Sequence, residues 1–370
     1  MAIFTDVLQD VTKNGRKLPT NEYKEFGHHP IIDQGQNDIA GYTDETNGLF
    51  SDVPAIIFGD HTRVIKYVDV PFFIGADGVK ILKAKGNKAN YKFLYYALSS
   101  AKIPNTGYNR HFKWLKEVDI PTYTEREQSQ IVSELDRITA LIDLRTEQLN
   151  KLDQLVKSRF IELFGDPFNN KKWVTQKLRN ISVSISDGSN VDKTHYENEG
   201  DVLFLRIQNV WFNEFRLDDS VYISDDVNNE YLDTSLHHGD LLITKIGRYY
   251  TKDSSLGRVS VYLGEDDKAN YSNNIMRVRL TDEVCSEFVN VLMNLDDYNR
   301  YIREVSVGGT DKRALSKAII GDLPIIMPPK ELQLEFLEFV RQTDKSKLAV
   351  QQSLEKLETL KKSLMQQYFG

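Results

Sequence analysis

Apolar side chains recur every three or four residues along two long stretches of the chain. The first stretch carries Ile131, Leu135, Ile138, Ile142, Leu149 and Leu152, and the second carries Phe336, Val340, Val350, Leu354, Leu357 and Leu364. This spacing, sustained over about 40 residues, is typical of a coiled-coil seam. Prolines precede each stretch, at Pro121 and Pro328-Pro329, where they can open a helix without breaking its interior. The pattern predicts long helices over residues 122–165 and 327–370, each roughly 60 Å long.

The two predicted helices repeat each other. Residues 149–165 and 354–370 share eight identical positions at a constant offset of 205 residues, and both segments end in Phe-Gly. Upstream, Asp119 and Pro121 match Asp322 and Pro324 at an offset of 203 residues. A register kept over a whole helix indicates an internal duplication. Two such helices in one chain most economically pair with each other, although two unrelated amphipathic helices, each packed on its own core, remain an alternative.

The remaining segments, residues 1–121 and 166–326, are predicted to be two mixed α/β (α+β) domains built to one plan. Short runs that alternate apolar and polar residues between Gly, Asp and Pro turns predict strands. They occupy residues 29–35, 55–60, 63–75 and 80–84 in the first domain, and residues 201–210, 240–247, 257–264 and 274–280 in the second. Helices are expected at Tyr91–Ser99 and around Glu287–Val305. The predicted order is domain, long helix, domain, long helix.

Composition narrows the class of protein. The chain is 40% hydrophobic and 27% charged, and it has neither an 18-residue apolar run nor a signal-peptide start, which predicts a cytoplasmic protein without a membrane span. Its single cysteine, Cys285, fits a reducing compartment and excludes a disulfide framework. A net charge of −7 argues against indiscriminate coating of nucleic acid, but leaves local basic surfaces open.

Several short segments resemble the specificity subunits of type I restriction-modification systems. Their order along the chain and their duplication make the resemblance specific. In the second domain they are residues 173–178 (WVTQKL), 204–210 (FLRIQNV), 239–247 (GDLLITKIG) and 257–261 (GRVSV). The first domain is similar to another branch of the same domain family through residues 29–32 (HPII), 59–60 (GD), 71–73 (PFF) and 93–96 (FLYY). Each domain ends in the same way, with Ile120-Pro121 or Leu323-Pro324. The opening of the first domain departs from the pattern, because residues 5–8 lack the tryptophan found in the second.

The resemblance implies a fold and a function. Each globular domain would be a target-recognition domain that reads one half of a bipartite, asymmetric site on double-stranded DNA. The two long helices would pair as an antiparallel coiled coil, set the gap between the half-sites and dock two adenine N6-methyltransferase subunits, through which restriction subunits join this phage-defence system. S-adenosylmethionine, ATP and Mg²⁺ would be bound by those partners, and this chain would bind no cofactor. A spacer of this length suits half-sites about one to one and a half DNA turns apart, since a turn is roughly 34 Å.

Loops rich in Lys, Arg, Asn, Gln and Tyr are the expected DNA contacts, because these side chains anchor phosphates or read base edges. In the first domain the candidates are Gln36, Asn37, His61, Arg63, Tyr108, Asn109, Arg110, His111 and Lys113. In the second they are Ser189, Asn190, Arg206, Gln208, Asn209, Lys245, Arg248, Tyr249, Tyr250, Lys252, Arg258, Thr310, Lys312 and Arg313. The alternative for any one of them is a solvated loop residue. Since the two domains differ in sequence, they are expected to read different half-sites.

The motifs of catalysis are not found in the sequence. Residues 166–169 (DPFN) and 327–330 (MPPK) do not match the Asn/Asp-Pro-Pro-aromatic tetrapeptide of an adenine methyltransferase, and no Gly-x4-Gly-Lys-Ser/Thr occurs. Glu22 and Lys24 lack a nuclease Pro-Asp partner, and the pairs His28-His29 and His237-His238 lack further ligands at metal spacing. We therefore expect no catalytic residue and no metal site.

A fused restriction or methyltransferase enzyme is one alternative function, and it would need these motifs. A coiled-coil assembly or antirestriction protein that binds partners and not DNA is the other alternative, favoured by the acidic balance and disfavoured by two basic loop sets.

Overall fold

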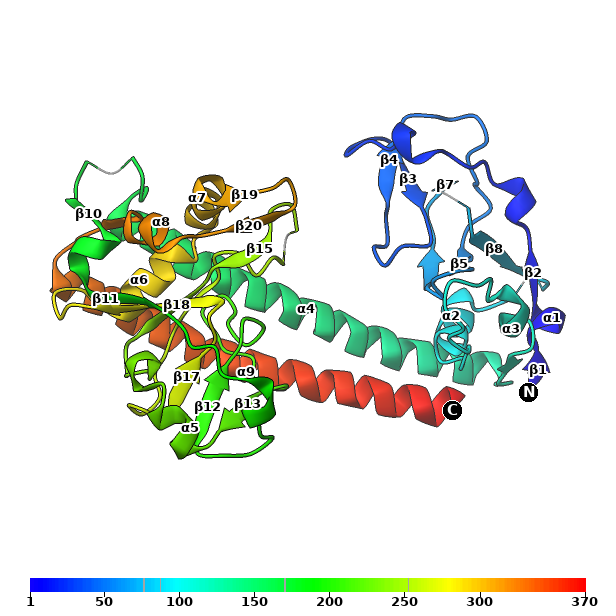
Figure 1. Cartoon of the computed structure of the whole chain (residues 1–370). Helices are drawn as coiled ribbons and strands as arrows, with labels where there is room; N and C mark the ends of the chain where they lie inside the picture. Colours follow the sequence, from blue (N-terminus) through cyan, green and yellow to red (C-terminus); the bar gives the residue numbers. More distant parts are fainter. Residues whose placement is uncertain (76, 87, 170, 252) are drawn as a thin grey trace. The chain divides into compact units, whose positions relative to one another are not determined.

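The computed structural model describes residues 1–75, 77–86, 88–169, 171–251 and 253–370. The chain divides into two compact units, one formed by Met1–Gln148 with Val350–Gly370 and the other by Leu149–Ala349. Both predicted long helices are present, as α4 (Glu125–Phe164) and α9 (Lys330–Phe369), each 40 residues long (Figure 1). Each long helix contributes to both units. Within the described residues, no helix is long and apolar enough to cross a membrane.

The first unit carries the first globular domain. Its larger sheet is antiparallel, in the order β2 (Leu8–Asp10), β8 (Val79–Ala84), β5 (Ala55–Gly59) and β6 (Ile65–Val68). A second sheet has the order β4 (Gly41–Thr43), β3 (His29–Ile32) and β7 (Phe73–Ile74), with β3 and β7 parallel. β1 (Ala2–Ile3) pairs with β9 (Asp119–Ile120) and so joins the two ends of the domain. Its helices are α1 (Phe4–Val7), α2 (Tyr91–Ser99) and α3 (Phe112–Leu115).

The second unit carries the second globular domain, which follows the same plan. Its larger sheet has the order β11 (Ser182–Asp187), β18 (Ile275–Leu280), β14 (Leu241–Thr244) and β16 (Val259–Val261). The smaller sheet is β13 (Val221–Ile223), β12 (Val202–Leu205) and β17 (Ala269–Tyr271), again with one parallel pair. β10 (Thr175–Lys177) pairs with β21 (Pro324–Ile326), as β1 does with β9. Its helices are α5 (Asp225–Asn229), α6 (Ser286–Met293), α7 (Asp296–Val305) and α8 (Lys317–Gly321).

One sheet belongs to the second domain alone within the described residues. It consists of β15 (Ile246–Arg248), β20 (Lys312–Ala314) and β19 (Val307–Gly308), all antiparallel. The single helix expected around Glu287–Val305 was wrong, because α6 and α7 are separate. Asn294 ends α6 by donating its side-chain amide to the carbonyls of Asn290 (2.8 Å) and Val259 (3.0 Å), and Leu295 is extended.

Each domain packs on the start of one long helix and on the end of the other. In the second unit, the rings of Phe164 on α4 and Phe336 on α9 lie 5.4 Å apart, and Phe164 lies 5.0 Å from Phe288 of α6. In the first unit, Phe369 at the end of α9 lies 5.4 Å from Phe93 of α2. Phe164 and Phe369 are equivalent in the sequence repeat, and Phe288 and Phe93 lie on the equivalent helices. The duplication therefore extends to the packing of the core.

The seam residues predicted for the long helices fall into two groups. Ile131, Leu135 and Phe336 are buried in the cores of the globular domains. The others lie buried or half-buried on the helices, at Ile138, Ile142, Leu149, Leu152, Val340, Val350, Leu354, Leu357 and Leu364. In the second unit the helices run in opposite directions, since Asp153 pairs with Lys347 (2.6 Å) and, further along α4, Arg159 pairs with Glu335 (3.8 Å).

A capping box fixes the start of α4. The Thr124 backbone N–H donates to the Glu127 carboxylate (2.8 Å), and the Glu127 backbone N–H donates to the Thr124 hydroxyl (3.3 Å). This reciprocal pair satisfies two backbone donors that a helix start would otherwise leave without partners. The backbone hydrogen bond from Thr124 also lowers the pKa of the Glu127 carboxyl.

Candidate nucleic-acid interface

The first-domain candidates come from loops that meet at one edge of the domain. Gln34, just beyond β3, links three of these loops. Its side-chain oxygen accepts the His61 backbone N–H (3.2 Å), its side-chain nitrogen donates to the Asp77 carbonyl (3.0 Å), and its own carbonyl accepts the Thr62 hydroxyl (2.6 Å). The loop that follows, with exposed Gln36 and Asn37, is therefore held beside the β5–β6 turn.

The exposed ring of Tyr108 stacks on the half-buried ring of His61 at this edge. Their rings are stacked, with centroids 4.6 Å apart and planes within 7°, and Tyr108 is 87% exposed. The Tyr108 loop is compact, because the Asn109 side-chain amide donates to the Thr106 carbonyl and Gly107 adopts a φ of 77°. Arg110 is exposed in the same loop. The loop thus presents an aromatic ring, an amide and a guanidinium to solvent.

Three first-domain candidates are occupied by contacts within the domain. His111 is fully buried, with Nδ1 3.0 Å from the Asp60 carbonyl. Arg63 is half-buried, has a φ of 64° and donates to the Ile103 carbonyl (3.3 Å). The Lys113 ammonium lies 4.1 Å from the centroid of the Trp114 ring. A hollow of about 470 Å³ is lined in part by Gln36 and Arg63. We infer that His111 supports the loops, because its side chain does not reach the surface.

A buried lysine supports the backbone of the Gln36–Asn37 loop. Lys66 of β6 is only 4% exposed and donates its ammonium to the Asn37 carbonyl (2.6 Å), with the Asp33 carboxylate 3.6 Å away. Burial lowers the pKa of Lys66, and the negative charge of Asp33 opposes this shift. The lysine therefore fixes the backbone of the loop while the loop side chains face solvent.

In the second domain, two candidate segments that lie far apart in sequence meet in the sheet formed by β15, β20 and β19. Arg248 of β15 stands opposite Lys312 of β20, and the Arg313 guanidinium stacks 4.2 Å from the centroid of the Tyr249 ring. Arg248, Tyr250, Thr310 and Lys312 are exposed. Lys245, just before β15, forms an ion pair with Asp187. Lys252, also a candidate, lies outside the described residues.

A second group of candidates converges on Asp219. Its carboxylate accepts from Asn209 (3.0 Å) and Gln208 (3.2 Å) and forms an ion pair with Arg206 (3.3 Å). Asn209 is fully buried, and its side-chain oxygen accepts the Arg206 backbone N–H (2.9 Å). These side chains stabilise the connection between β12 and β13. Only Gln208 among the three candidates is exposed.

Ser189 and Arg258 lie inside the second domain, whereas Asn190 is exposed. The Ser189 hydroxyl donates to the Tyr271 carbonyl (3.2 Å). The Arg258 guanidinium donates to the carbonyls of Asp253 and Ser254 and lies 3.7 Å from the centroid of the Trp211 ring. Burial lowers the pKa of Arg258, although a guanidinium stays charged. Arg258 therefore holds the chain segment that precedes it.

Trp211 was not among the residues predicted from the sequence. The Arg216 guanidinium lies 3.4 Å from the centroid of this ring, and two guanidiniums so close to one ring must lie on opposite faces of it. The alternation of aromatic residues and arginine in residues 211–216 (WFNEFR) was the available signal. Arg–aromatic stacking of this kind links the β12–β13 connection to the segment before β16.

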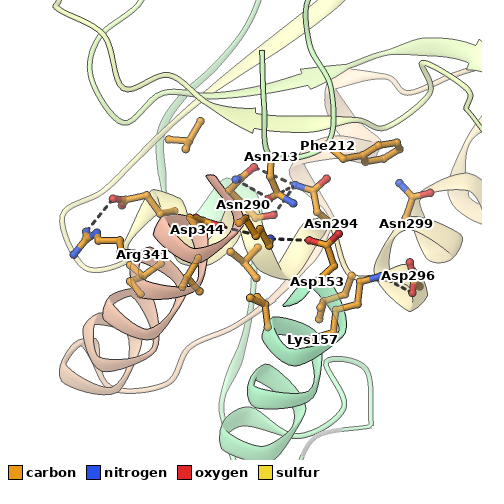
Figure 2. A pocket seen from close by; sticks show the side chains of 18 of the residues that line it. Asp153, Lys157, Phe212, Asn213, Asn290, Asn294, Asp296, Asn299, Arg341 and Asp344 are labelled. Atoms are coloured by element: carbon orange, nitrogen blue, oxygen red, sulfur yellow. Dashed lines mark hydrogen bonds and ion pairs between the residues drawn. The ribbon is translucent and has the colours of Figure 1, made fainter. Parts of the chain in front are cut away.

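A cavity in the second unit has balanced charges. It measures about 820 Å³, and α4, α6, α7 and α9 all contribute side chains to its wall. Figure 2 shows the ion pairs along its wall, among them Lys157 with Asp296 (2.8 Å) and Arg341 with Glu287 (3.4 Å). Because its cations are matched by carboxylates, the cavity has no excess positive charge to attract a phosphate. Within the described residues, no group of three His, Cys, Asp or Glu side chains is placed to hold a metal ion.

Comparison with known proteins shows that the first part of the chain is similar to DNA-specificity proteins. The sequence model of the type I restriction modification DNA specificity domain matches residues 5–154. The Escherichia coli EcoR124I/EcoR124II type I restriction enzyme specificity subunit is 33% identical over 146 residues, which cover 36% of this chain and 36% of that relative. The alignment thus spans about a third of the length of the curated relative.

The fold extends the similarity to the whole chain. The type I restriction-modification S subunit from M. genitalium superposes with a TM-score of 0.55 at 16% identity, covering 100% of this chain and 95% of that one. A chain from a study of complex assembly and conformational transition in the type I system superposes with a TM-score of 0.52 at 15% identity, with the same coverage. Residues 5–154 are thus similar to the type I restriction modification DNA specificity domain, and the whole chain shares its fold with the solved S subunit from M. genitalium. These findings support the specificity-subunit interpretation over that of a coiled-coil assembly protein.

Proposed function

We propose that this chain is the DNA sequence-specificity subunit of a type I restriction-modification system. Each globular domain, residues 1–121 and 166–326, reads one half of a bipartite, asymmetric DNA site. The spacer helices, residues 122–165 and 327–370, set the distance between the half-sites, so a change in their length shifts the gap without changing either half-sequence. The chain itself performs no catalysis, as is general for specificity subunits.

One observation supports this proposal most strongly. In both domains, groups of candidate side chains follow equivalent strands: Gln36 and Asn37 come after β3 as Gln208 comes after β12, and His61 comes after β5 as Lys245 comes after β14. These groups therefore lie at the same edge of one repeated fold. The exposed candidates are the residue types that contact DNA: Gln36, Asn37 and Arg110 in the first domain, and Arg248, Tyr250 and Lys312 in the second. A duplicated scaffold with two different polar edges is what a reader of two different half-sites requires.

The partners follow from the proposed role. Two adenine N6-methyltransferase subunits dock on the helices and supply the chemistry, with S-adenosylmethionine bound to them, and restriction subunits that use ATP and Mg²⁺ join through them. The acidic net charge of −7 means that the isolated chain binds DNA weakly, because phosphate contact depends on cations. Stable binding is then a property of the assembly.

DNA binding by the purified assembly tests the proposal against the partner-binding alternative. The chain, alone and with cognate methyltransferase subunits, is incubated with a library of random duplexes, and the retained duplexes are sequenced. We expect the assembly to enrich one motif made of two short sequences separated by a fixed gap. Assembly with the methyltransferase but no enriched motif would favour the alternative.

A further inference from the structure

Backbone hydrogen bonds that occur in both domains identify equivalent positions. In the first domain, the Asp60 N–H donates to the Gly78 carbonyl (2.6 Å), and the Asp60 carbonyl accepts the His111 N–H (2.8 Å). In the second domain, the Lys245 N–H donates to the Asn274 carbonyl (2.9 Å), and the Lys245 carbonyl accepts the Leu315 N–H (2.9 Å). Asp60 and Lys245 thus occupy the same place at the end of equivalent strands, β5 and β14.

The domains diverge immediately beyond this shared position. The first closes a tight turn, because the Gly59 N–H already donates to the Val64 carbonyl (2.8 Å). The second pairs Thr244 N–H with the carbonyl of Arg258 (3.0 Å), so its turn is longer and includes β15. The segment before Leu315 also differs between the domains. It forms β19 and β20 in the second domain, whereas the described residues before His111 form only a loop in the first. Two insertions therefore meet and pair with each other as one sheet.

Contacts with the segment 253–258 of the second domain hold the sheet β15-β20-β19 in place. A Cβ at Gly247 would lie 2.3 Å from the backbone nitrogen of Leu256, so only glycine allows β15 to approach that segment. The Ser255 hydroxyl donates to the Ile246 carbonyl (2.7 Å), and buried Arg258 binds the carbonyls of Asp253 and Ser254. Tyr249 and Arg313 stack between adjacent strands. These contacts give the sheet a fixed position on the domain.

The exposed surface of the sheet is basic on an acidic chain. Residues 245–251 and 306–314 contain four cations and one carboxylate, Asp311. The Arg248 side chain is 65% exposed, with Asp311 at 3.6 Å as a weak partner, and Tyr250 is 78% exposed. Lys312, which is paired with Arg248 across the strands, is also exposed. A twisted antiparallel ribbon fits the major groove of B-DNA, where Arg and Lys recognise the O6 and N7 atoms of guanine.

We propose that the sheet β15-β20-β19 is a ribbon that enters the major groove, with Arg248 and Lys312 reading guanines in the half-site of the second domain. The first domain has no such ribbon among its described residues and reads its half-site with loops. This proposal rests on the proposed function and names the reading element of one domain. It also predicts that the half-site read by the second domain contains at least one G·C pair at the ribbon.

The test is a methylome of cells that express the full chain, or a variant, with the cognate methyltransferase. The double variant Arg248→Ala/Lys312→Ala should lose about 5- to 150-fold in preference for guanine at one or two positions of one half-site, and leave the other half-site unchanged. A photo-crosslinking amino acid at position 250 should attach to that same half-site. Arg300→Ala is the matched control, because Arg300 has a similar side-chain exposure (68%) and also lies beside a carboxylate, Asp297.

Duplexes with 7-deazaguanine separate base reading from phosphate contact. Removal of N7 in the affected half-site should weaken binding by the wild-type assembly and leave binding by the Arg248→Ala/Lys312→Ala assembly unchanged. A uniform fall in methylation with an unaltered motif, or a change in both half-sites, would overturn the ribbon proposal while the proposed function stands. If no gapped motif depended on the chain at all, the proposed function itself would fail.

Discussion

Arginine side chains of the second domain have different roles that depend on burial and contacts. Arg248 is exposed, with the Asp311 carboxylate 3.6 Å away, whereas Arg258 is 5% exposed and donates to backbone carbonyls. The sequence presents both as candidates for DNA contact, because residue type and local pattern do not distinguish an exposed arginine from a buried one. Burial depends on Trp211, which is 47 residues away in the chain, and short-range patterns carry no information about such a contact.

Arg258→Met should destabilise the second domain by about 1–3 kcal/mol, because it leaves buried carbonyls without donors while keeping most of the side-chain volume. Urea denaturation followed by tryptophan fluorescence measures the change. Arg216→Met is the control on the same ring: Arg216 is half-exposed, so its replacement should cost less than about 1 kcal/mol. Equal losses for the two variants would contradict the supporting role of Arg258.

Asp322, near the end of the second domain, should make the stability of the folded state depend on pH. A hydrogen bond from Lys177 (2.7 Å) lowers the pKa of the Asp322 carboxyl, and the positive charge of Arg179 lowers it further. Since the pKa is lower in the folded than in the unfolded state, the stabilisation is complete above the unfolded pKa. It is lost as the pH falls through the folded pKa.

The variant Asp322→Asn should therefore reduce stability at neutral pH and lose less further stability on acidification. Thermal unfolding of wild type and variant between about pH 2 and pH 7 gives the comparison, over the range in which a carboxyl titrates. We expect the two melting temperatures to converge at the acid end. Parallel curves with a constant difference would show that the carboxylate charge does not matter.

At the scale of elements, patterns within one segment were sufficient for much of the fold. The three-and-four spacing predicted α4 and α9, and the strands predicted at residues 55–60 and 240–247 contain β5 and β14. The pairing of β15 with β20 was not predictable, because 246–248 and 312–314 are short and their hydrogen bonds are with each other. The break between α6 and α7 likewise depends on the contact of Asn294 with distant Val259.

Phe336 tests whether α9 is an integral part of the second domain. It is fully buried and packs against Phe160, Phe164 and Phe288, so Phe336→Ala should cost about 3–5 kcal/mol. Leu348→Ala on the same helix is the control, because Leu348 is 56% exposed and its loss should cost little. Chemical denaturation compares the two. A small effect of Phe336→Ala would show that the helix does not complete this core.

At the scale of the whole molecule, duplication accounts for the architecture. The strand orders β2-β8-β5-β6 and β11-β18-β14-β16 match, and the repeated Phe369 and Phe164 dock on the equivalent helices α2 and α6. The sequence repeat indicated this plan before any contact was known. Which loop side chains meet DNA could not be predicted, because exposure depends on how the loops pack: His111 and Asn209 are fully buried, whereas Tyr108 and Gln208 are exposed.

The most direct test of the specificity role is single-molecule sequencing of N6-methyladenine in cells that express a cognate methyltransferase with and without this chain. We expect methylation at one asymmetric motif with a gap of fixed length, present only when the chain is expressed. Both half-sites would then be known. An identical methylation pattern with and without the chain would contradict the specificity role.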